Sequence, residues 1–127
     1  LLAHPRLVAK CSEHGIDLYA KRGNLLVHPP LAYPDLVASA LHARGVVTDS
    51  GGLQKEAFLL RVPCTTVRPQ TEWVETVQLG WNILVEPGSA LTEAASRPRT
   101  AEPDPEVAHP YGDGHAAERV AEVLLAK

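Results

Sequence analysis

Short apolar runs alternate with stretches of helical spacing along most of the 127-residue chain. The continuous apolar runs predict strands at residues 24–28, 45–49, 64–67 and 82–85. Apolar residues spaced three and four apart predict helices at residues 5–14, 33–43, 52–60, 72–79, 89–95 and 113–126. Strands that alternate with helices are typical of βαβ units, in which a parallel sheet is covered on both faces. The pattern therefore predicts an α/β fold, a Rossmann-like three-layer domain with a parallel sheet.

The pattern is less clear after residue 85. Four prolines and several charges between residues 96 and 110 predict an exposed loop. The last predicted helix has an apolar side that we expect to face inward, formed by Ala116, Val120, Val123 and Leu124. We expect Asp113 to cap the amino end of this helix.

Composition narrows the range of functions. The length fits one domain, and the formal net charge of -3 gives no basic footprint for nucleic acid. No apolar run reaches the length of a membrane span, and no secretory signal is visible. The chain contains no methionine and opens on Leu1-Leu2-Ala3-His4, so we expect a piece of a longer protein.

The cysteines and histidines do not indicate metal or redox chemistry. Cys11 and Cys64 have neither a CxxC nor a zinc-type spacing. The six histidines fall on different predicted elements, without HxH or HxxxH spacing. We therefore expect reduced thiols, a cytoplasmic protein, no metal site and no cofactor.

The clearest candidate chemistry lies between Val46 and Glu56. An apolar strand leads into the turn Ser50-Gly51-Gly52, and a predicted helix follows at once. The first turn of a helix carries unpaired backbone N–H groups and a partial positive charge, and glycine lets an anion approach them. Ligands of open parallel sheets bind beyond the carboxyl ends of the strands. The turn is therefore a candidate phosphate site, although the same spacing also fits a purely structural helix cap.

Three neighbouring features each have two interpretations. Glu56 lies one helical turn beyond the glycines and could accept hydrogen bonds from the two hydroxyls of a ribose, or could be a solvated helix glutamate. Asp49 could be a catalytic acid, but its place at the end of a strand favours an acceptor that shapes the turn. Residues 111–114 (Tyr-Gly-Asp-Gly) could form a second ligand loop, but a structural turn before the last helix is favoured.

Further motifs accompany the glycine turn. They are residues 48–57 (Thr-Asp-Ser-Gly-Gly-Leu-Gln-Lys-Glu-Ala), Val62-Pro63, Arg68, Thr71-Glu72 and Glu75-Thr76-Val77, with His4-Pro5-Arg6 and Pro110-Tyr111-Gly112-Asp113-Gly114 at the two ends. Together they resemble the signature of the bacterial non-hydrolysing UDP-N-acetylglucosamine 2-epimerases. The resemblance covers nearly the whole chain.

The resemblance implies that residues 1–127 are the C-terminal, nucleotide-binding domain of an enzyme with a two-domain, GT-B-type architecture. It implies that the enzyme interconverts UDP-N-acetylglucosamine and UDP-N-acetylmannosamine by elimination and re-addition of UDP. The groups that move protons would belong to an N-terminal domain of the parent chain, which is absent from this sequence. A homodimer and a place in cell-envelope polysaccharide biosynthesis are also implied.

The same resemblance implies roles for individual residues. Ser50, Gly51 and Gly52 would hold the diphosphate, and Glu56 would hold the ribose. The other residues expected to bind UDP or the UDP-N-acetylhexosamine are Arg68, Glu72 and Leu36.

Two positions depart from the family pattern. Trp73 stands where many members carry an arginine that helps to bind the nucleotide sugar, and tryptophan cannot replace a guanidinium fork. Leu36 stands where many members carry an aromatic residue near the uracil, so we expect weaker stacking on the base.

Two other functions fit a nucleotide held at a helix N-terminus. One is a non-catalytic module that binds nucleotide sugars, and the other is the C-terminal domain of a GT-B glycosyltransferase. The string Asp-Ser-Gly-Gly-x-Gln-x-Glu, followed by the pair Thr71-Glu72, favours the epimerase over the transferase.

Overall fold

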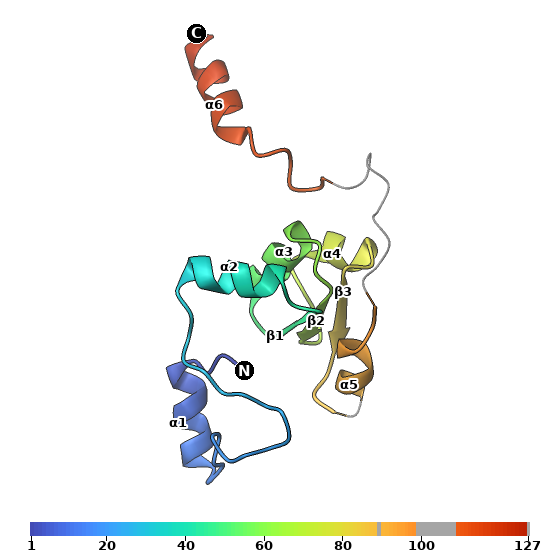
Figure 1. The fold of residues 1–127 in the computed structure, drawn as a ribbon. Helices are drawn as coiled ribbons and strands as arrows, with labels where there is room; N and C mark the ends of the chain where they lie inside the picture. Colours follow the sequence, from blue (N-terminus) through green and yellow to red (C-terminus); the bar gives the residue numbers. More distant parts are fainter. Residues whose placement is uncertain (89, 99–108, 127) are drawn as a thin grey trace. The chain divides into compact units, whose positions relative to one another are not determined.

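The computed structural model of the chain describes residues 1–88, 90–98 and 109–126 (Figure 1). The chain divides into two compact units, Leu1–Ser39 and Ala40–Lys127. Helix α2 (Tyr33–Leu41) spans the boundary between them. None of the helices in the described ranges is long and apolar enough to cross a membrane.

The first unit contains helix α1 (Pro5–Glu13), which confirms the helix predicted at 5–14 to within one residue. His4 caps its amino end, because the ring Nδ1 accepts a hydrogen bond from the backbone N–H of Arg6 at 3.2 Å. Pro5 occupies the first helical position, where a missing N–H costs nothing. Gly15, with φ of 63°, follows the helix end and allows the chain to turn there.

The strand predicted at residues 24–28 is wrong. The structure has only an isolated parallel bridge between Leu2 and His28. The backbone N–H of Ala3 donates to the carbonyl of His28 at 2.8 Å, and the N–H of His28 donates to the carbonyl of Leu1 at 2.9 Å. Pro29-Pro30 follow directly and have no N–H to continue a ladder, so an apolar run here does not become a strand.

The second unit is built on a parallel sheet of β1 (Val46–Thr48), β2 (Cys64–Val67) and β3 (Asn82–Val85), in the order β1-β2-β3. Its first register row aligns Val46 with Cys64 and Cys64 with Asn82. Helices α3 (Gly51–Leu59) and α4 (Val74–Gln78) connect consecutive strands, and α5 (Ala90–Ala95) follows β3. The predicted α/β fold with a parallel sheet is therefore confirmed.

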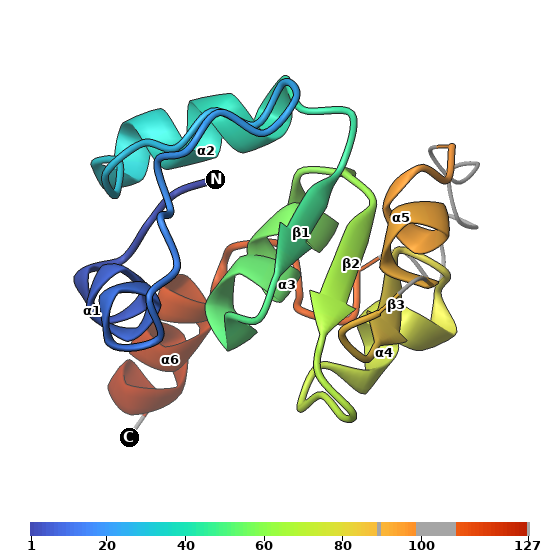
Figure 2. The ribbon, with the colours of Figure 1, turned by 90° about the horizontal axis from the view of Figure 1, so that it is seen from below.

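The helices cover both faces of this sheet. Helices α3 and α4 contact each other and pack on one face, whereas α5 packs against β2 and β3 from the opposite face (Figures 1 and 2). The buried core between them contains Ala57, Phe58, Val62, Cys64 and Trp81. The rings of Phe58 and Trp81 meet edge to face, with centroids 6.5 Å apart. This arrangement brings the carboxyl ends of β1 and β2 and the amino end of α3 to one edge of the sheet.

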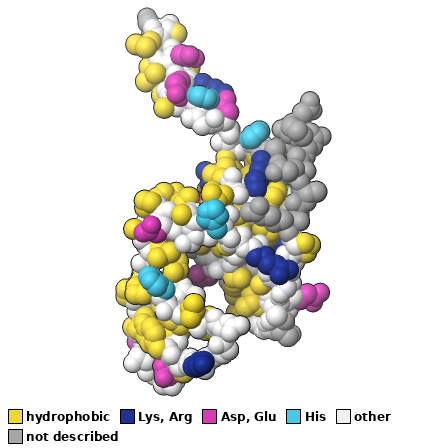
Figure 3. Space-filling view, in the orientation of Figure 1, with side chains coloured by type: hydrophobic (Ala, Val, Ile, Leu, Met, Phe, Trp, Pro, Cys, Tyr) yellow, Lys and Arg dark blue, Asp and Glu magenta, His cyan; other side chains and the backbone are white. Residues whose placement is uncertain are grey.

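Two expectations about the last helix, α6 (Ala116–Leu125), are wrong. His115, not Asp113, is the N-cap residue, and Asp113 instead accepts a hydrogen bond from the backbone N–H of His115. The side chains expected to face inward are exposed: Val120 by 58%, Val123 by 69% and Leu124 by 67%. Figure 3 shows apolar side chains, in yellow, on the surface of this helix. The amphipathic pattern is present, but no described residue buries its apolar side.

Candidate functional site

The turn between β1 and α3 has the geometry of an open helix start. Ser50 is the N-cap residue of α3, in an extended conformation with φ of -78° and ψ of 130°. Its backbone N–H donates to Thr48 Oγ1 at 3.0 Å, and its own hydroxyl makes no capping hydrogen bond. The hydroxyl and the first N–H groups of α3 can therefore be donors to an anion.

The two glycines of this turn have different surroundings. A Cβ added at Gly51 would collide with Glu72 Oε1 and would lie 3.8 Å from Arg68 Nη1. A Cβ added at Gly52 would meet no atom within 4 Å. Gly51 therefore allows the side chain of Glu72 to approach the helix, whereas Gly52 leaves the first helical turn open.

An ion pair lies beside Gly51. Arg68 Nη1 is 3.3 Å from Glu72 Oε2, and the two side chains are 37% and 52% exposed. An exposed pair of this kind contributes about 0–1 kcal/mol, so the partners can exchange for a ligand at low cost. The structure thus brings together Ser50, Gly51, Arg68 and Glu72, four of the residues expected at the site.

A buried glutamine links the turn to the segment that carries Glu72. Gln54 is 0% exposed, and its Nε2 donates to the carbonyl of Ser50 at 3.2 Å. Its Oε1 accepts hydrogen bonds from Thr71 Oγ1 at 2.6 Å and from Asn82 Nδ2 at 3.1 Å. The Thr71 hydroxyl also accepts a hydrogen bond from the backbone N–H of Trp73 at 3.0 Å.

The network continues into the sheet. Asn82 Nδ2 also donates to Thr76 Oγ1 at 3.2 Å, and Thr66 Oγ1 donates to Asn82 Oδ1 at 2.8 Å. A buried network with all its members paired holds its parts at fixed separations. The pattern of the sequence did not indicate this role for Gln54. A signal was present, because Gln54 lies four residues after Ser50 and three before the core residue Ala57.

The side chain of Trp73 belongs to an aromatic cluster. Its ring meets that of Tyr111 edge to face at 5.7 Å, and Lys55 Nζ lies 5.0 Å from the Trp73 centroid and 4.7 Å from the Tyr111 centroid. Tyr111 also packs against Phe58 at 5.5 Å. These contacts favour the structural interpretation of the segment at 111–114. They also place a cation, Lys55, beside Trp73, the position at which the resemblance leads us to expect an arginine.

The phenol of Tyr111 is perturbed by its surroundings. Burial, and then the neighbouring carboxylate of Glu75, raise the pKa of Tyr111 to about 12. The hydroxyl lies 3.4 Å from Glu75 Oε2, to which it donates. At neutral pH this contact therefore joins a neutral phenol to Glu75, and the phenol is an unsuitable general base.

Two further residues were expected at the site, Glu56 and Leu36. Glu56 is half-buried on α3, four residues after Gly52 and hence on the same face of the helix. It has no ion pair or side-chain hydrogen bond with any described residue, so its acceptors are available. Leu36 is half-buried in α2 and belongs to the Leu1–Ser39 unit, so its expected role at the base stays a prediction.

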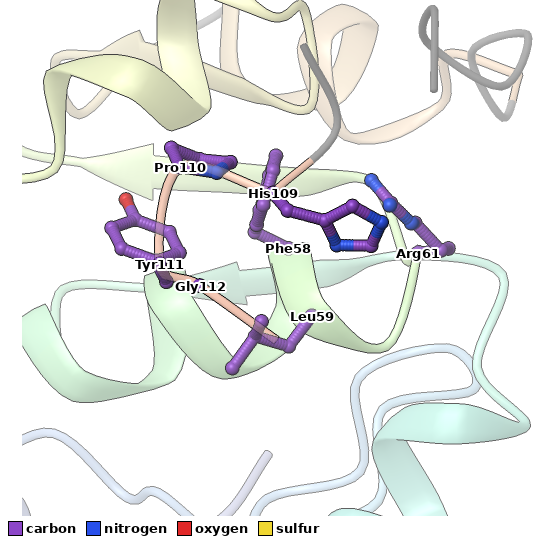
Figure 4. A pocket seen from close by; sticks show the side chains of 7 residues that line it. All are labelled: Phe58, Leu59, Arg61, His109, Pro110, Tyr111 and Gly112. Atoms are coloured by element: carbon purple, nitrogen blue, oxygen red, sulfur yellow. The ribbon is translucent and has the colours of Figure 1, made fainter. Parts of the chain in front are cut away.

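A shallow cavity of about 210 Å³ lies beside the second half of α3, away from the glycine turn (Figure 4). It is lined by Phe58, Leu59, Arg61, His109, Pro110, Tyr111 and Gly112. None of the residues expected to bind the nucleotide lines it. Within the described ranges, no three His, Cys, Asp or Glu side chains come together as a metal site.

Comparison with known proteins identifies relatives that match most of this chain. A protein of Methanococcus maripaludis described as a UDP-N-acetylglucosamine 2-epimerase homolog is 41% identical over 102 residues, which are 80% of this chain and 28% of the relative. The UDP-2,3-diacetamido-2,3-dideoxy-D-glucuronate 2-epimerase of Pseudomonas aeruginosa is 36% identical over 121 residues, 95% of this chain and 33% of the relative.

A solved structure is also similar. The Methanocaldococcus jannaschii UDP-GlcNAc 2-epimerase, in complex with UDP-GlcNAc and UDP, superposes with a TM-score of 0.79 at 31% identity, over 98% of this chain and 34% of that chain. This chain therefore spans about a third of the length of its relatives. The family model described as UDP-N-acetylglucosamine 2-epimerase matches residues 3–125. The chain thus belongs to the UDP-N-acetylglucosamine 2-epimerase family.

Proposed function

We propose that this chain, as one domain over residues 1–127, is the UDP-binding part of an enzyme that interconverts UDP-N-acetylglucosamine and UDP-N-acetylmannosamine. The observation that carries the proposal is the open start of α3 at the carboxyl end of β1, where a Cβ at Gly52 would meet no atom within 4 Å and Arg68 supplies a cation. The similar structure from Methanocaldococcus jannaschii, solved with UDP-GlcNAc and UDP, supports a nucleotide sugar as the ligand.

Each part of the ligand has a matching group in this chain. The diphosphate accepts hydrogen bonds from the N–H groups of Gly51 and Gly52 and from the hydroxyl of Ser50, with Arg68 as counter-charge. Glu56, on the face of α3 that carries Gly52, accepts hydrogen bonds from the ribose hydroxyls. Leu36 is the proposed apolar contact of the uracil.

The proton transfers of the reaction need groups from elsewhere. Elimination and re-addition of UDP require a proton to leave one face of the sugar carbon and to return on the other. Here Glu72 is paired with Arg68, and Glu75 is bonded to Tyr111. Glu56 is committed to the ribose in this proposal. We therefore place the acid–base groups in an N-terminal domain of a longer chain, which also closes the cleft around the sugar.

A second substrate class is supported by one specific observation. The Pseudomonas aeruginosa relative, whose name gives a UDP-diacetamido-glucuronate as substrate, matches 95% of this chain. Both substrates share the UDP part and differ in the sugar. The chain holds the UDP part in either case, so the discrimination between them belongs to the sugar side of the cleft. We further propose, from the same family membership, a role in cell-envelope polysaccharide biosynthesis and a place in the cytoplasm.

A chimera tests the proposal. The corresponding third of the Methanocaldococcus jannaschii enzyme is replaced by this chain, and conversion of UDP-N-acetylglucosamine is followed by NMR of the anomeric proton. We expect turnover, and we expect its loss when the chimera carries Gly52→Val. A chimera that folds and binds UDP-N-acetylglucosamine but converts neither it nor the diacetamido-glucuronate would indicate a binding module instead.

A further inference from the structure

The carboxylate of Glu72 occupies the approach to the first residue of α3. Its Oε1 lies too close to position 51 to leave room for a Cβ there, and its Oε2 accepts a hydrogen bond from Arg68 Nη1 at 3.3 Å. This is the same region in which the proposed function places the diphosphate. A negative charge beside a helix N-terminus is stabilised by the helix dipole, so a carboxylate in this position behaves as a substitute anion.

Two anions cannot share this place. At contact distance, a carboxylate and a phosphate repel each other, and both would compete for the same guanidinium of Arg68. We infer that Glu72 is an internal competitor of the diphosphate: without a nucleotide it pairs with Arg68 beside Gly51, and when the nucleotide binds it releases Arg68 to the phosphates. The inference rests on the proposed function, because it requires a diphosphate at Gly51.

The surroundings of Glu72 allow its side chain to move alone. The carboxylate is half exposed, and Arg68 is its only hydrogen-bond partner among the described residues. The residues on either side are anchored, because Thr71 donates to the buried Gln54 and the N–H of Trp73 donates to Thr71. Rotation of the Glu72 side chain therefore opens the turn without moving the backbone.

This role has a consequence for selectivity. A ligand must displace a carboxylate that already has a cation and a helix terminus, so a weak anion gains little by entering. A diphosphate carries more charge and more acceptor oxygens than a carboxylate, and it can engage Arg68 and the helix N–H groups together. Glu72 thus determines which anions bind, and the opposite role, a direct ligand of the nucleotide sugar, predicts the opposite effect of its removal.

Calorimetric titrations with UDP and with inorganic pyrophosphate separate the two roles. The variants of the chain are Glu72→Gln and a matched control, Glu75→Gln. The control removes the same charge three residues further along the chain, from a side chain that bonds to Tyr111 and is not among the atoms nearest to a Cβ at Gly51. We expect Glu72→Gln to lower the Kd of both ligands by about threefold or more, which corresponds to the free energy of an exposed ion pair. Glu75→Gln should change both by a smaller factor.

Each other outcome decides against the inference. If the wild type binds UDP and Glu72→Gln binds it equally or more weakly, Glu72 is a spectator or a ligand and the proposed function still stands. Tightening of UDP without pyrophosphate would place Glu72 at the nucleoside. If neither ligand binds the wild type, the proposed function fails and the inference fails with it. Should Glu72→Gln unfold, Glu72→Asp, which withdraws the carboxylate from Gly51, must tighten both ligands as well.

Discussion

Replacing Gln54 by leucine should damage both the stability of the fold and the geometry of the site. Gln54 is fully buried, and its amide makes three side-chain hydrogen bonds, to the carbonyl of Ser50, to Thr71 and to Asn82. Leucine has a similar volume but offers neither donor nor acceptor. The turn at Ser50 and the segment that follows Arg68 would then lose the link that holds them together.

The expected magnitude follows from these three contacts. Each hydrogen bond contributes about 0.5–1.5 kcal/mol, and a partner left unpaired in a buried position costs about 1–3 kcal/mol. Asn82 keeps its contact with Thr76, and leucine gains some apolar burial, so both moderate the loss. We expect Gln54→Leu to lower the free energy of unfolding by about 2–4 kcal/mol, and to weaken UDP binding under conditions in which the variant is folded.

Urea unfolding followed by circular dichroism measures the first quantity, with Gln78→Leu as a matched control. Gln78 is an exposed glutamine on α4 without a side-chain hydrogen bond to any described residue. Its replacement should change the free energy of unfolding by less than about 0.5 kcal/mol. Equal effects of the two substitutions would refute the assignment of a linking role to Gln54.

Four further predictions concern other residues. Glu56→Gln should weaken UDP binding about tenfold, since charge-assisted hydrogen bonds are worth about 1.5–3 kcal/mol each, and should leave pyrophosphate binding unchanged by calorimetry. The 127-residue chain alone should not epimerise UDP-N-acetylglucosamine in an NMR assay, because in the described ranges the carboxylates nearest the turn, Glu72 and Glu75, lie on one side of it and cannot flank a sugar ring. The pKa of Tyr111 is raised from 10.0 to about 12 by burial and by Glu75, so the fold should lose stability as pH rises through this interval, and Tyr111→Phe should remove this loss. Iodoacetamide should modify Cys11 before Cys64, because Cys64 is 1% exposed and burial raises the pKa of its thiol.

Each of these predictions has a contrary result. Equal losses for UDP and pyrophosphate would move Glu56 from the ribose to the phosphates or to folding. Epimerisation by the purified chain that survives repurification and disappears in Glu72→Gln would place the chemistry in this domain. A phenolate absorbance of Tyr111 that appears near pH 10 would contradict its raised pKa. Equal rates of modification at Cys11 and Cys64 would contradict the buried position of Cys64.

The sequence predicts the strands of the sheet better than the packing of the segments outside it. Strands β2 and β3 have the predicted bounds, and β1 lies within its predicted range, because each apolar run is bounded by turn residues. The apolar run at 24–28 has the composition of a strand, but composition does not supply a strand to pair with. Similarly, the periodicity of α6 predicts an apolar side and cannot show which surface covers it.

The residues of the candidate site likewise fall into those that the sequence predicts and those that only the structure reveals. The order of strand, glycine turn and helix is local, so it can be read from consecutive residues and gives Ser50, Gly51 and Gly52 directly. The contacts of Gln54 with Thr71 and Asn82 join segments that are 17 and 28 residues apart. The spacing of Gln54 from Ala57 indicates that it faces the core, but its partners depend on how α3 and α4 pack on the sheet, which a single sequence does not reveal.

The most direct test of the account is a calorimetric titration of UDP into the wild-type chain and into Gly52→Val. A Cβ at Gly52 would meet no atom within 4 Å, so the variant should keep the circular dichroism spectrum and the thermal midpoint of the wild type. The valine would cover the N–H groups of the first helical turn, and we expect UDP affinity to fall at least about tenfold, a loss of about 1.4 kcal/mol or more. A Gly52→Val chain that is folded and binds UDP as tightly as the wild type would contradict the nucleotide site at this turn.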